Sequence, residues 1–212
     1  MRQNESHLRI AVLGASGGTG RLAVASALAR GHEIVALTRR GDVLPPAPGL
    51  TEVAWGDVSD RDGLAAALTG ADVVISALGG AAKGPTSVCT DAIRSVVPVM
   101  GALGVPRLIA MSAHGVLESH DRSLYARAVW AGVGEKLKDK EAMEPLITAS
   151  SLDWTIVRAP ALSNARGSGA PRAGERLPIR LWHSIGRADL AGFLVTEAER
   201  GDFVRTIVRV RA

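Results

Sequence analysis

The chain contains 212 residues, of which 47% are hydrophobic, and these values suit a single globular domain with a sizeable core. Its one cysteine, Cys89, excludes a disulfide framework and a multi-cysteine metal site. The formal net charge of +4, from 25 basic and 21 acidic residues, and the aromatic content of 3% together argue against a nucleic-acid-binding surface.

Two features of the sequence set expectations about location. No apolar run approaches the roughly 20 residues that a membrane helix needs. The polar start MRQNESH lacks the apolar segment of a signal peptide. We therefore expect a cytoplasmic protein with no membrane partner. The densest basic stretch, 166–180, is interpreted as a loop near an anionic ligand or as a solvated segment.

The predicted elements alternate between strands and helices in chain order. Short apolar runs indicate the strands, and apolar residues at helical spacing indicate the helices. The expected strands span 8–13, 32–40, 51–57, 71–80, 105–115, 152–160 and 203–210. The expected helices span 21–30, 59–70, 86–102, 134–149 and 188–200.

Local signals mark two of the helices. Ser59 or Asp60 is expected to cap the second helix, which Gly70 closes. Pro98 should kink or shorten the helix over 86–102, because proline lacks the N–H group that a helix interior uses.

The alternation of strands and helices predicts an α/β fold. Short connections favour a Rossmann-like, doubly wound parallel sheet. The chain, 1–212, should form one domain with a small C-terminal substrate lobe, and 113–133 and 161–190 should supply the substrate side. Ligands of such folds bind beyond the carboxyl ends of the strands, so we look for chemistry there.

The stretch GASGGTG, 14–20, joins the first strand to the first helix. Gly14 would allow a sharp turn, Gly17 would let a ligand approach the backbone, and Gly20 would let the helix pack closely. Free amides at a helix start suit the diphosphate of a dinucleotide. The alternative is a glycine-rich turn with no ligand. The predicted cofactor contacts of this stretch are Gly14, Ser16, Gly17, Gly18, Thr19, Gly20 and Arg21.

The end of the second strand reads Thr38-Arg39-Arg40. NAD-binding sites usually place an acid here to accept a hydrogen bond from the ribose 2′-hydroxyl, and none is present. A guanidinium pairs well with a phosphate, and Arg21 could converge on the same group. We therefore predict NADP(H) in preference to NAD(H), with all three strand-end residues as contacts. The alternative is that the arginines are solvated surface charges.

The ends of the other strands supply further cofactor contacts. Asp57 could accept from the adenine amino group while Val58 covers the ring, although a simple turn role for Asp57 is the alternative. Small residues after the fourth strand should let the ribose and diphosphate pass close to the backbone. A serine at the end of the fifth strand would face the nicotinamide. The contacts predicted at these two ends are Ala77, Leu78, Gly79, Met111 and Ser112.

Several segments together resemble the atypical short-chain dehydrogenase/reductase group, from about residue 8 to 210. They are GASGGTGR, LTRR, GDV, ISALG, MSAHG, SSLDWTIVRAPALSN and GRADLAGFLVTEAE. The similarity is closest to NAD(P)H-binding, NmrA-like members, which include flavin and biliverdin reductases. In such proteins the DWTIVRAPAL segment leads into a loop beside the nicotinamide, so the resemblance implies that Ala159 and Pro160 contact the cofactor.

The resemblance also implies where the catalytic tyrosine and lysine of the group should lie in this sequence. Reductases of the group often use Tyr-x-x-x-Lys, in which the tyrosine donates a proton and the lysine holds the nicotinamide ribose. The lysine falls on Lys140, but four residues earlier the chain has Lys136. The only tyrosine, Tyr125, has Val129 where the lysine should stand. The pair is therefore broken, as it is in the flavin and biliverdin reductases that this chain resembles.

Three residues are predicted to act in catalysis. Ser112 could polarise the acceptor or the carboxamide, His114 could donate a proton, and Lys140 could contact the ribose. The alternatives are that His114 caps backbone groups in a loop and that Lys140 is a helix-surface lysine.

Other polar residues receive structural interpretations. His183 could touch the substrate, whereas His32 and His120 are expected at the surface. Cys89 is interpreted as a small core residue. Asp91 and Arg94 are expected on a solvated helix face. No metal-ligand spacing and no G-x-S-x-G elbow are present, which leaves metal and hydrolase chemistry without support.

The function predicted is an NADPH-dependent oxidoreductase that transfers a hydride to a flat conjugated acceptor, such as a flavin, quinone, bilin or polyketide-like aromatic. The alternative is a non-catalytic NADP(H)-binding redox sensor with a protein partner. A third hypothesis is an isomerase or dehydratase that keeps the cofactor site as a scaffold.

Overall fold

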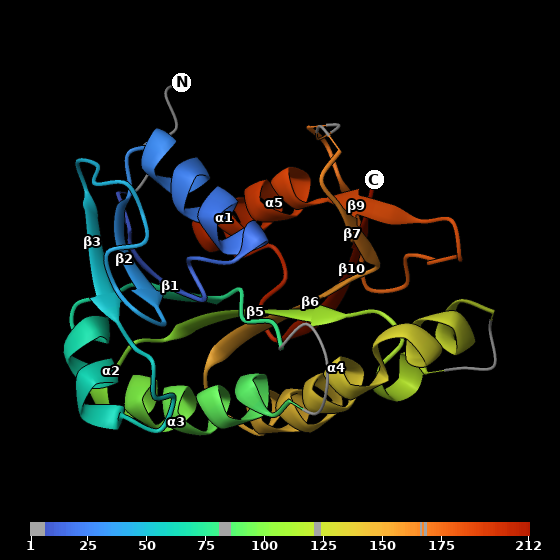
Figure 1. Cartoon of the computed structure of the whole chain (residues 1–212), viewed down its shortest axis with the longest axis horizontal. Coiled ribbons are helices and arrows are strands. Elements are labelled where there is room, and N and C mark those ends of the chain that lie inside the picture. The colour runs from blue at the N-terminus through green and yellow to red at the C-terminus, as the bar shows by residue number, and fades with distance from the viewer. Residues whose placement is uncertain (1–6, 81–85, 121–123, 166, 168) are drawn as a thin grey trace.

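The computed structural model describes residues 7–80, 86–120, 124–165, 167 and 169–212. An eight-stranded sheet forms its centre (Figure 1). In spatial order the sheet contains β3 (Leu50–Ala54), β2 (Glu33–Thr38), β1 (Arg9–Leu13), β4 (Val73–Ser76), β5 (Arg107–Ala113), β6 (Asp153–Ala159), β10 (Thr206–Arg211) and β8 (Arg172–Gly174). Neighbouring strands are parallel except β10 and β8 at one edge. The strand order reverses between β1 and β4, which confirms the predicted doubly wound, Rossmann-like fold.

Helices cover both faces of the sheet (Figure 1). One face carries α1 (Gly18–Ala29) and α5 (Arg187–Arg200), and the other carries α2 (Arg61–Leu68), α3 (Val88–Leu103) and α4 (Leu124–Thr148). Alternate residues of a strand enter the two cores, as Leu108 and Ile109 of β5 do. Because both faces are buried, the central strands are nearly continuous apolar runs.

Helix α3 continues past Pro98 to Leu103, so the expectation that the proline would shorten the helix is wrong, while the expected kink stays a prediction. Pro98 cannot donate to the carbonyl oxygen of Arg94 one turn earlier. Nη2 of Arg61 in α2 donates to this oxygen instead, at 3.2 Å. A side chain from the neighbouring helix thus satisfies the group that proline leaves open. The cap of α2 is as predicted, because Asp60 accepts a hydrogen bond from the amide of Gly63 at 2.9 Å.

Helix α4 begins ten residues earlier than the predicted helix over 134–149. Val133 has non-helical dihedral angles (φ −138°, ψ 27°), which divide the helix into two parts. The second part corresponds to the predicted helix. The first part lies in the substrate-side region, 113–133, for which the sequence indicated no regular structure.

A small lobe follows β6. Strands β7 (Ala161–Ser163) and β9 (Ser184–Gly186) pair in parallel as a second sheet, while β8 between them joins the edge of the main sheet. The lobe leads directly into α5. A short 3-10 turn, Leu117–Ser119, follows β5. Among the described residues, no helix combines the length and hydrophobicity of a membrane span.

Candidate functional site

The glycine-rich turn at the carboxyl end of β1 is tightly fixed. The amides of Gly14 and Ala15 both donate to the carbonyl oxygen of Leu37, at 3.1 and 3.2 Å. Gly14 has a φ of +74°, which favours glycine. A Cβ atom at Gly20 would lie 2.2 Å from the carbonyl oxygen of Gly14. The turn therefore needs glycine at these two positions so that α1 can pack against it.

The start of α1 offers unused backbone donors. Gly17 caps the helix without a side-chain hydrogen bond. The amides of the first three helical residues, Gly18, Thr19 and Gly20, have no hydrogen-bond partner among the described residues. Gly17 and Gly18 are exposed, so a ligand can reach these donors. This arrangement fits an anionic group such as a diphosphate.

Arg187 lies across this turn, a contact that the sequence reasoning missed. A Cβ atom at Gly18 would lie 3.0 Å from Cδ of Arg187, so the arginine side chain lies close against this position. Its Nη1 donates to Oδ1 of Asn164 in the lobe at 2.6 Å. The only sequence signal was its position at the start of the GRADLA segment. Arg187 thus connects the glycine turn to the lobe and adds a positive charge beside the open amides.

The end of β2 carries the predicted 2′-phosphate residues. Thr38 is buried, and its hydroxyl donates to Oε1 of Glu52 at 2.7 Å and accepts from the amide of Gly41. Its side chain therefore holds the loop. Arg39 and Arg40 are exposed. Within the described ranges of the chain neither arginine forms an ion pair with a carboxylate, and their contact with a 2′-phosphate stays a prediction.

Glu52, which the sequence reasoning did not use, lies on the neighbouring strand β3. Its carboxylate also accepts from the amides of Val43 and Leu44, at 3.1 and 3.0 Å. Desolvation raises the pKa of Glu52, but these hydrogen bonds and the charge of Arg21 leave it lowered overall. Both carboxylate oxygens are already bonded, so this acid is poorly placed to accept from a ribose hydroxyl.

Asp57 forms a local turn. Its Oδ1 accepts from the amide and the hydroxyl of Ser59, at 2.8 and 2.7 Å, and these bonds lower its pKa. Val58 is half-buried against the core on the α2–α4 side. At the end of β4, the amide of Ala77 donates to the carbonyl of Leu13, and Gly79 is exposed. The turn role of Asp57, left open by the sequence, is present.

Lys140 is buried, so the interpretation as a helix-surface lysine is wrong. Its Nζ donates to the carbonyl oxygens of Leu78 and Met111, at 3.0 and 2.7 Å. Sδ of Met143, a weak acceptor, lies 3.9 Å away. The ammonium therefore sits between the carboxyl ends of β4 and β5, where a cofactor ribose would pass in this fold.

Ser112 is bound to a buried ion pair. Its hydroxyl donates to Oε1 of Glu144 at 2.6 Å, and Glu144 also accepts from Nη2 of Arg158 at 2.6 Å. Arg158 binds Glu118 as well. Burial lowers the pKa of Arg158, but its bonds to both carboxylates leave it raised overall. Because the hydroxyl hydrogen of Ser112 points to Glu144, the hydroxyl oxygen can accept a hydrogen bond from a ligand, such as a carboxamide N–H.

The end of β6 lies beside the loop after β5. His114 is buried, and its amide donates to the carbonyl oxygen of Ala159 at 2.8 Å. Ala159 and Pro160 are both buried. His183 is half-buried in the lobe, where burial and the charges of Arg211 and Arg180 lower its pKa.

The remaining polar residues have structural surroundings. His32 is buried, contrary to expectation: its Nδ1 accepts from the amide of Leu8, which leaves Nε2 to donate to Glu199 at 2.9 Å. His120 is exposed and stacks on Trp130 with 4.2 Å between ring centroids. Cys89 is a buried core residue, and burial raises the pKa of its thiol. Asp91 and Arg94 form an ion pair at the surface.

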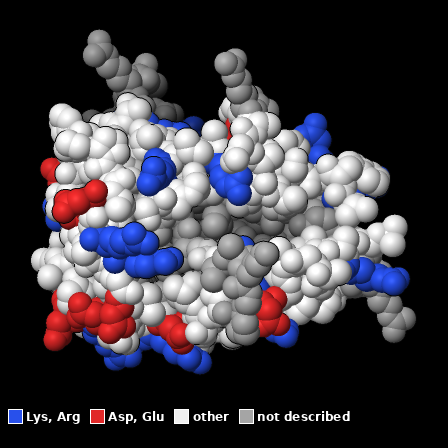
Figure 2. All heavy atoms as spheres, viewed as in Figure 1, with Lys and Arg blue, Asp and Glu red and all other residues white. Residues whose placement is uncertain are grey.

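The predicted site residues lie together at the carboxyl ends of the central strands. The glycine turn, Lys140 and Ser112 lie at the carboxyl ends of β1, β4 and β5. Figure 2 shows a hollow at the centre of this face, with Lys and Arg side chains above it and to its left. Within the described part of the chain, no group of three or more His, Cys, Asp or Glu side chains could hold a metal ion.

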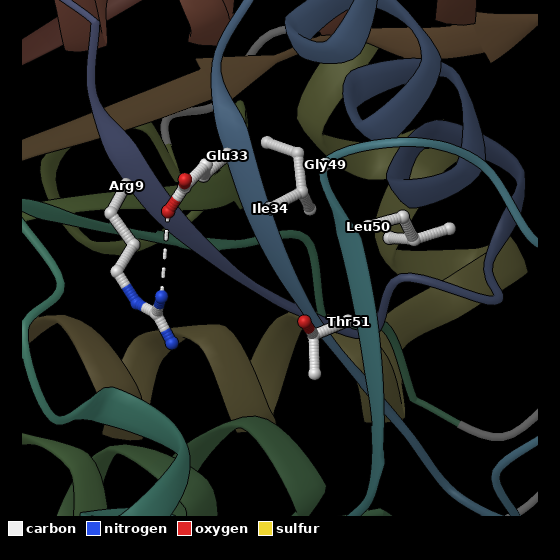
Figure 3. A pocket seen from close by; sticks show the side chains of 6 residues that line it. All are labelled: Arg9, Glu33, Ile34, Gly49, Leu50 and Thr51. Atoms are coloured by element: carbon white, nitrogen blue, oxygen red, sulfur yellow. Dashed lines mark hydrogen bonds and ion pairs between the residues drawn. The ribbon is translucent and has the colours of Figure 1, made fainter.

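A separate open pocket of about 250 Å³ lies at the opposite edge of the sheet (Figure 3). It is lined by Arg9, Glu33, Ile34, Gly49, Leu50 and Thr51. Nη1 of Arg9 lies 3.5 Å from Oε2 of Glu33 (Figure 3). These residues belong to the amino-terminal ends of β1, β2 and β3, away from the candidate site.

Comparisons with known proteins agree with this geometry. The sequence model described as NAD(P)H-binding matches residues 14–200. The UPF0659 protein YMR090W of Saccharomyces cerevisiae is 26% identical over 204 residues, which cover 90% of this chain and 86% of that protein. Two solved structures have the same fold. ChuY, an anaerobillin reductase from Escherichia coli O157:H7, matches with a TM-score of 0.80 and 24% identity over 95% of this chain and 96% of that chain. A short-chain dehydrogenase/reductase from Veillonella parvula, solved in complex with NADP, matches with a TM-score of 0.80 and 19% identity over 97% and 94% of the two chains.

Proposed function

Because the chain belongs to the NAD(P)H-binding family, we propose that it is an NADPH-dependent oxidoreductase that transfers a hydride to a flat conjugated acceptor. A flavin, a quinone, a bilin or a polyketide-like aromatic has the required chemistry. The observation that carries the proposal is the buried Lys140, which is anchored at the ends of β4 and β5 while Lys136 stands where a proton-donating tyrosine would be.

Different residues of the site bind different parts of the cofactor. The open amides of 18–20 hold the diphosphate. Arg21, Arg39 and Arg40 attract the 2′-phosphate, and Glu52 is occupied by its own loop, so NADP(H) is preferred over NAD(H). Lys140 offers to the ribose the N–H that otherwise faces only Sδ of Met143, a weak acceptor. When bound, the reduced nicotinamide supplies the hydride.

The proton donors of the site favour a conjugated acceptor over a simple carbonyl compound. Carbonyl reduction needs a group that protonates the developing oxygen. The Ser112 hydroxyl already donates a hydrogen bond to Glu144, and Lys136 stands four residues before Lys140, where the tyrosine of the catalytic pair would be. A conjugated acceptor takes the hydride at carbon or nitrogen and can be protonated by solvent. The chain then contributes position and orientation, with His114 as a candidate donor.

The test is to mix the purified protein with NADPH and follow absorbance at the reduced-nicotinamide band while flavins, quinones and bilins are added in turn. Acceptor-dependent oxidation supports the reductase. Saturable NADPH binding without oxidation of any acceptor contradicts it.

A second candidate function is a redox sensor that binds NADP(H) without turnover. The hydrogen bond from Ser112 to Glu144 favours the sensor, because it directs the hydroxyl hydrogen to Glu144 and so leaves it unavailable for protonating a substrate. The sensor should bind NADP+ and NADPH, oxidise nothing, and copurify with a protein partner.

A further inference from the structure

A row of polar side chains crosses the sheet at the carboxyl ends of three neighbouring strands. Ser112 of β5 is in register with Arg158 of β6, and Arg158 with Arg209 of β10. Residues in register point to the same face of a sheet, and the strands lie about 4.8 Å apart. The row is on the α4 face, because Ser112 and Arg158 both bind Glu144 of that helix. The row therefore runs from the proposed nicotinamide side, at β5, toward the outermost strand, β8.

Two more arginines extend the row to the edge. Arg211 lies two residues after Arg209 and so points to the same face. Arg211 pairs with Arg172 across the antiparallel ladder of β10 and β8. We call Arg172, Arg209 and Arg211 the arginine strip. Arg172 is exposed and the other two are half-buried, so solvent and ligands reach all three.

The arginine strip carries positive charge, and Glu118 offsets part of the charge of Arg209. Within the described part of the chain, none of its three guanidinium groups forms an ion pair with a carboxylate. Arg209 and Arg211 instead donate to backbone carbonyls at long distances of 3.5 and 3.4 Å. The segments 161–186 and 206–212 contain one acid, Glu175, and several arginines. Glu118, from outside these segments, interacts with Arg209, so an anion would meet the least repulsion at the end of the strip formed by Arg172 and Arg211.

Glu118 shows that a carboxylate fits beside this row. Arg158 is fully buried and holds Glu144 on its inner side. On its outer side it holds Glu118, whose side chain is 61% exposed. Desolvation raises the pKa of Glu118, but its bond to Arg158 and the charges of Arg158 and Arg209 leave it lowered overall. The protein's own carboxylate is thus already stabilised where the row meets the strip, and a ligand anion would bind farther along, at Arg211 and Arg172.

We propose that the arginine strip binds a carboxylate or phosphate group of the acceptor while its conjugated part is reduced in the crevice. This inference rests on the proposed reductase function. A guanidinium binds an oxyanion through paired hydrogen bonds, and three guanidinium groups on one face give the anion several such partners. The strip selects anionic acceptors over neutral acceptors of the same shape.

The test compares acceptors that differ only in the anionic group, using the full chain and NADPH. FMN and riboflavin differ by a phosphate, and a carboxyl-bearing naphthoquinone and its methyl ester differ by a carboxylate. The charged member of at least one pair should have a KM about tenfold lower, and the pair that responds distinguishes phosphate from carboxylate. Arg172→Met and Arg211→Met should each raise the KM for the charged acceptor about tenfold and leave that for the neutral one unchanged.

Two controls separate this inference from the reductase itself. Arg200→Met removes an exposed arginine at the far end of α5 and should change neither KM. Equilibrium dialysis of FMN and riboflavin with the NADP+-loaded protein needs no turnover. Selective binding of FMN without NADPH oxidation supports the strip and contradicts the reductase. Equal KM and equal binding within both pairs, or a variant effect that is the same for charged and neutral acceptors, overturns the strip.

Discussion

Nζ of Lys140 donates to the carbonyl oxygen of Met111 at 2.7 Å from the middle of a helix, and only 7% of the lysine is exposed. The same ammonium binds the carbonyl of Leu78 at 3.0 Å. One side chain of α4 therefore joins the chain just beyond the paired residues of β4 and β5, whose register ends at Ser76 and Ala110. The shape of the proposed nicotinamide side depends on this lysine.

Replacing the lysine should weaken both the fold and cofactor binding. Lys140→Met leaves two inward carbonyls without their donor, which should lower the free energy of unfolding by about 1–3 kcal/mol. The Kd for NADPH should rise about tenfold, as expected for one lost hydrogen bond from a charged group. Urea denaturation and a fluorescence titration measure the two effects. Lys138→Met, on the exposed side of the same helix, is the control, and unchanged NADPH affinity in Lys140→Met would contradict the assigned role.

The cofactor preference can be tested at the end of β2. Arg39→Glu replaces a charge that attracts the 2′-phosphate with one that repels it. The KM for NADPH should rise at least tenfold, while the KM for NADH changes little. Steady-state kinetics with both cofactors measures this. Arg94→Glu, at another exposed site, is the control, and an equal response of the two cofactors would show that the 2′-phosphate lies elsewhere.

The tight contact of α1 with the glycine turn predicts a matched pair of variants. Gly20→Ala forces a Cβ atom to within 2.2 Å of a backbone oxygen and should lower the free energy of unfolding by about 1–3 kcal/mol or more. Gly101→Ala in α3 meets no atom within 4 Å and should raise it by about 0.5–1 kcal/mol. Denaturation of the two variants side by side measures the difference. A loss in both would mean that helix propensity does not act at Gly101.

Arg187 should contribute to binding of both cofactors, because it lies beside the amides that face the shared diphosphate. Arg187→Met is expected to raise the Kd for NADPH and NADH by a similar factor, about tenfold. This outcome differs from that of Arg39→Glu, which acts on one cofactor. Titration of each variant with both cofactors distinguishes the two positions. An effect confined to NADPH would place the 2′-phosphate near Arg187.

Acid should weaken the link between Arg158 and Glu118. The pKa of Glu118 is below 4.5 in the folded protein, so the unfolded chain binds more protons as the pH falls. The contribution of Glu118 to stability is present above about pH 4.5 and is lost as the pH falls through the folded-state pKa. Urea denaturation from pH 6 to pH 3 should show a smaller decline for Glu118→Gln than for the wild type. Glu175→Gln should decline as the wild type does.

The fold was predictable because its signals are local. Alternating apolar runs and helical spacing indicated the parallel sheet, and the position of GASGGTG after a strand indicated the turn on which α1 begins. The undiminished length of α3 past Pro98 was not predictable, because the donor that replaces the proline N–H comes from Arg61, far away in sequence. Rules of local sequence predict that a proline removes one helical hydrogen bond, but they do not predict that a side chain from another helix supplies the missing donor.

The chemistry of the site was predictable only in part, for the same reason. The residue types at the strand ends were visible in the sequence, but their partners were not. Glu52 accepts a hydrogen bond from Thr38 on the adjacent strand, and Glu144, on a helix 32 residues later, accepts one from Ser112. Long-range contacts of this kind decide whether a polar side chain faces a ligand or the protein.

The buried pair of Arg158 and Glu144 has a consequence for how this chain can vary over evolutionary time. Loss of Arg158 leaves the enclosed carboxylate of Glu144 without its cationic partner, which typically costs 3–5 kcal/mol. Loss of Glu144 leaves Arg158 with Glu118 as its remaining carboxylate partner among the described residues. A change of Arg158 is therefore tolerated only together with a change of Glu144. Lineages that keep Glu144 should also keep Arg158, and departures from arginine at 158 should coincide with departures from glutamate at 144.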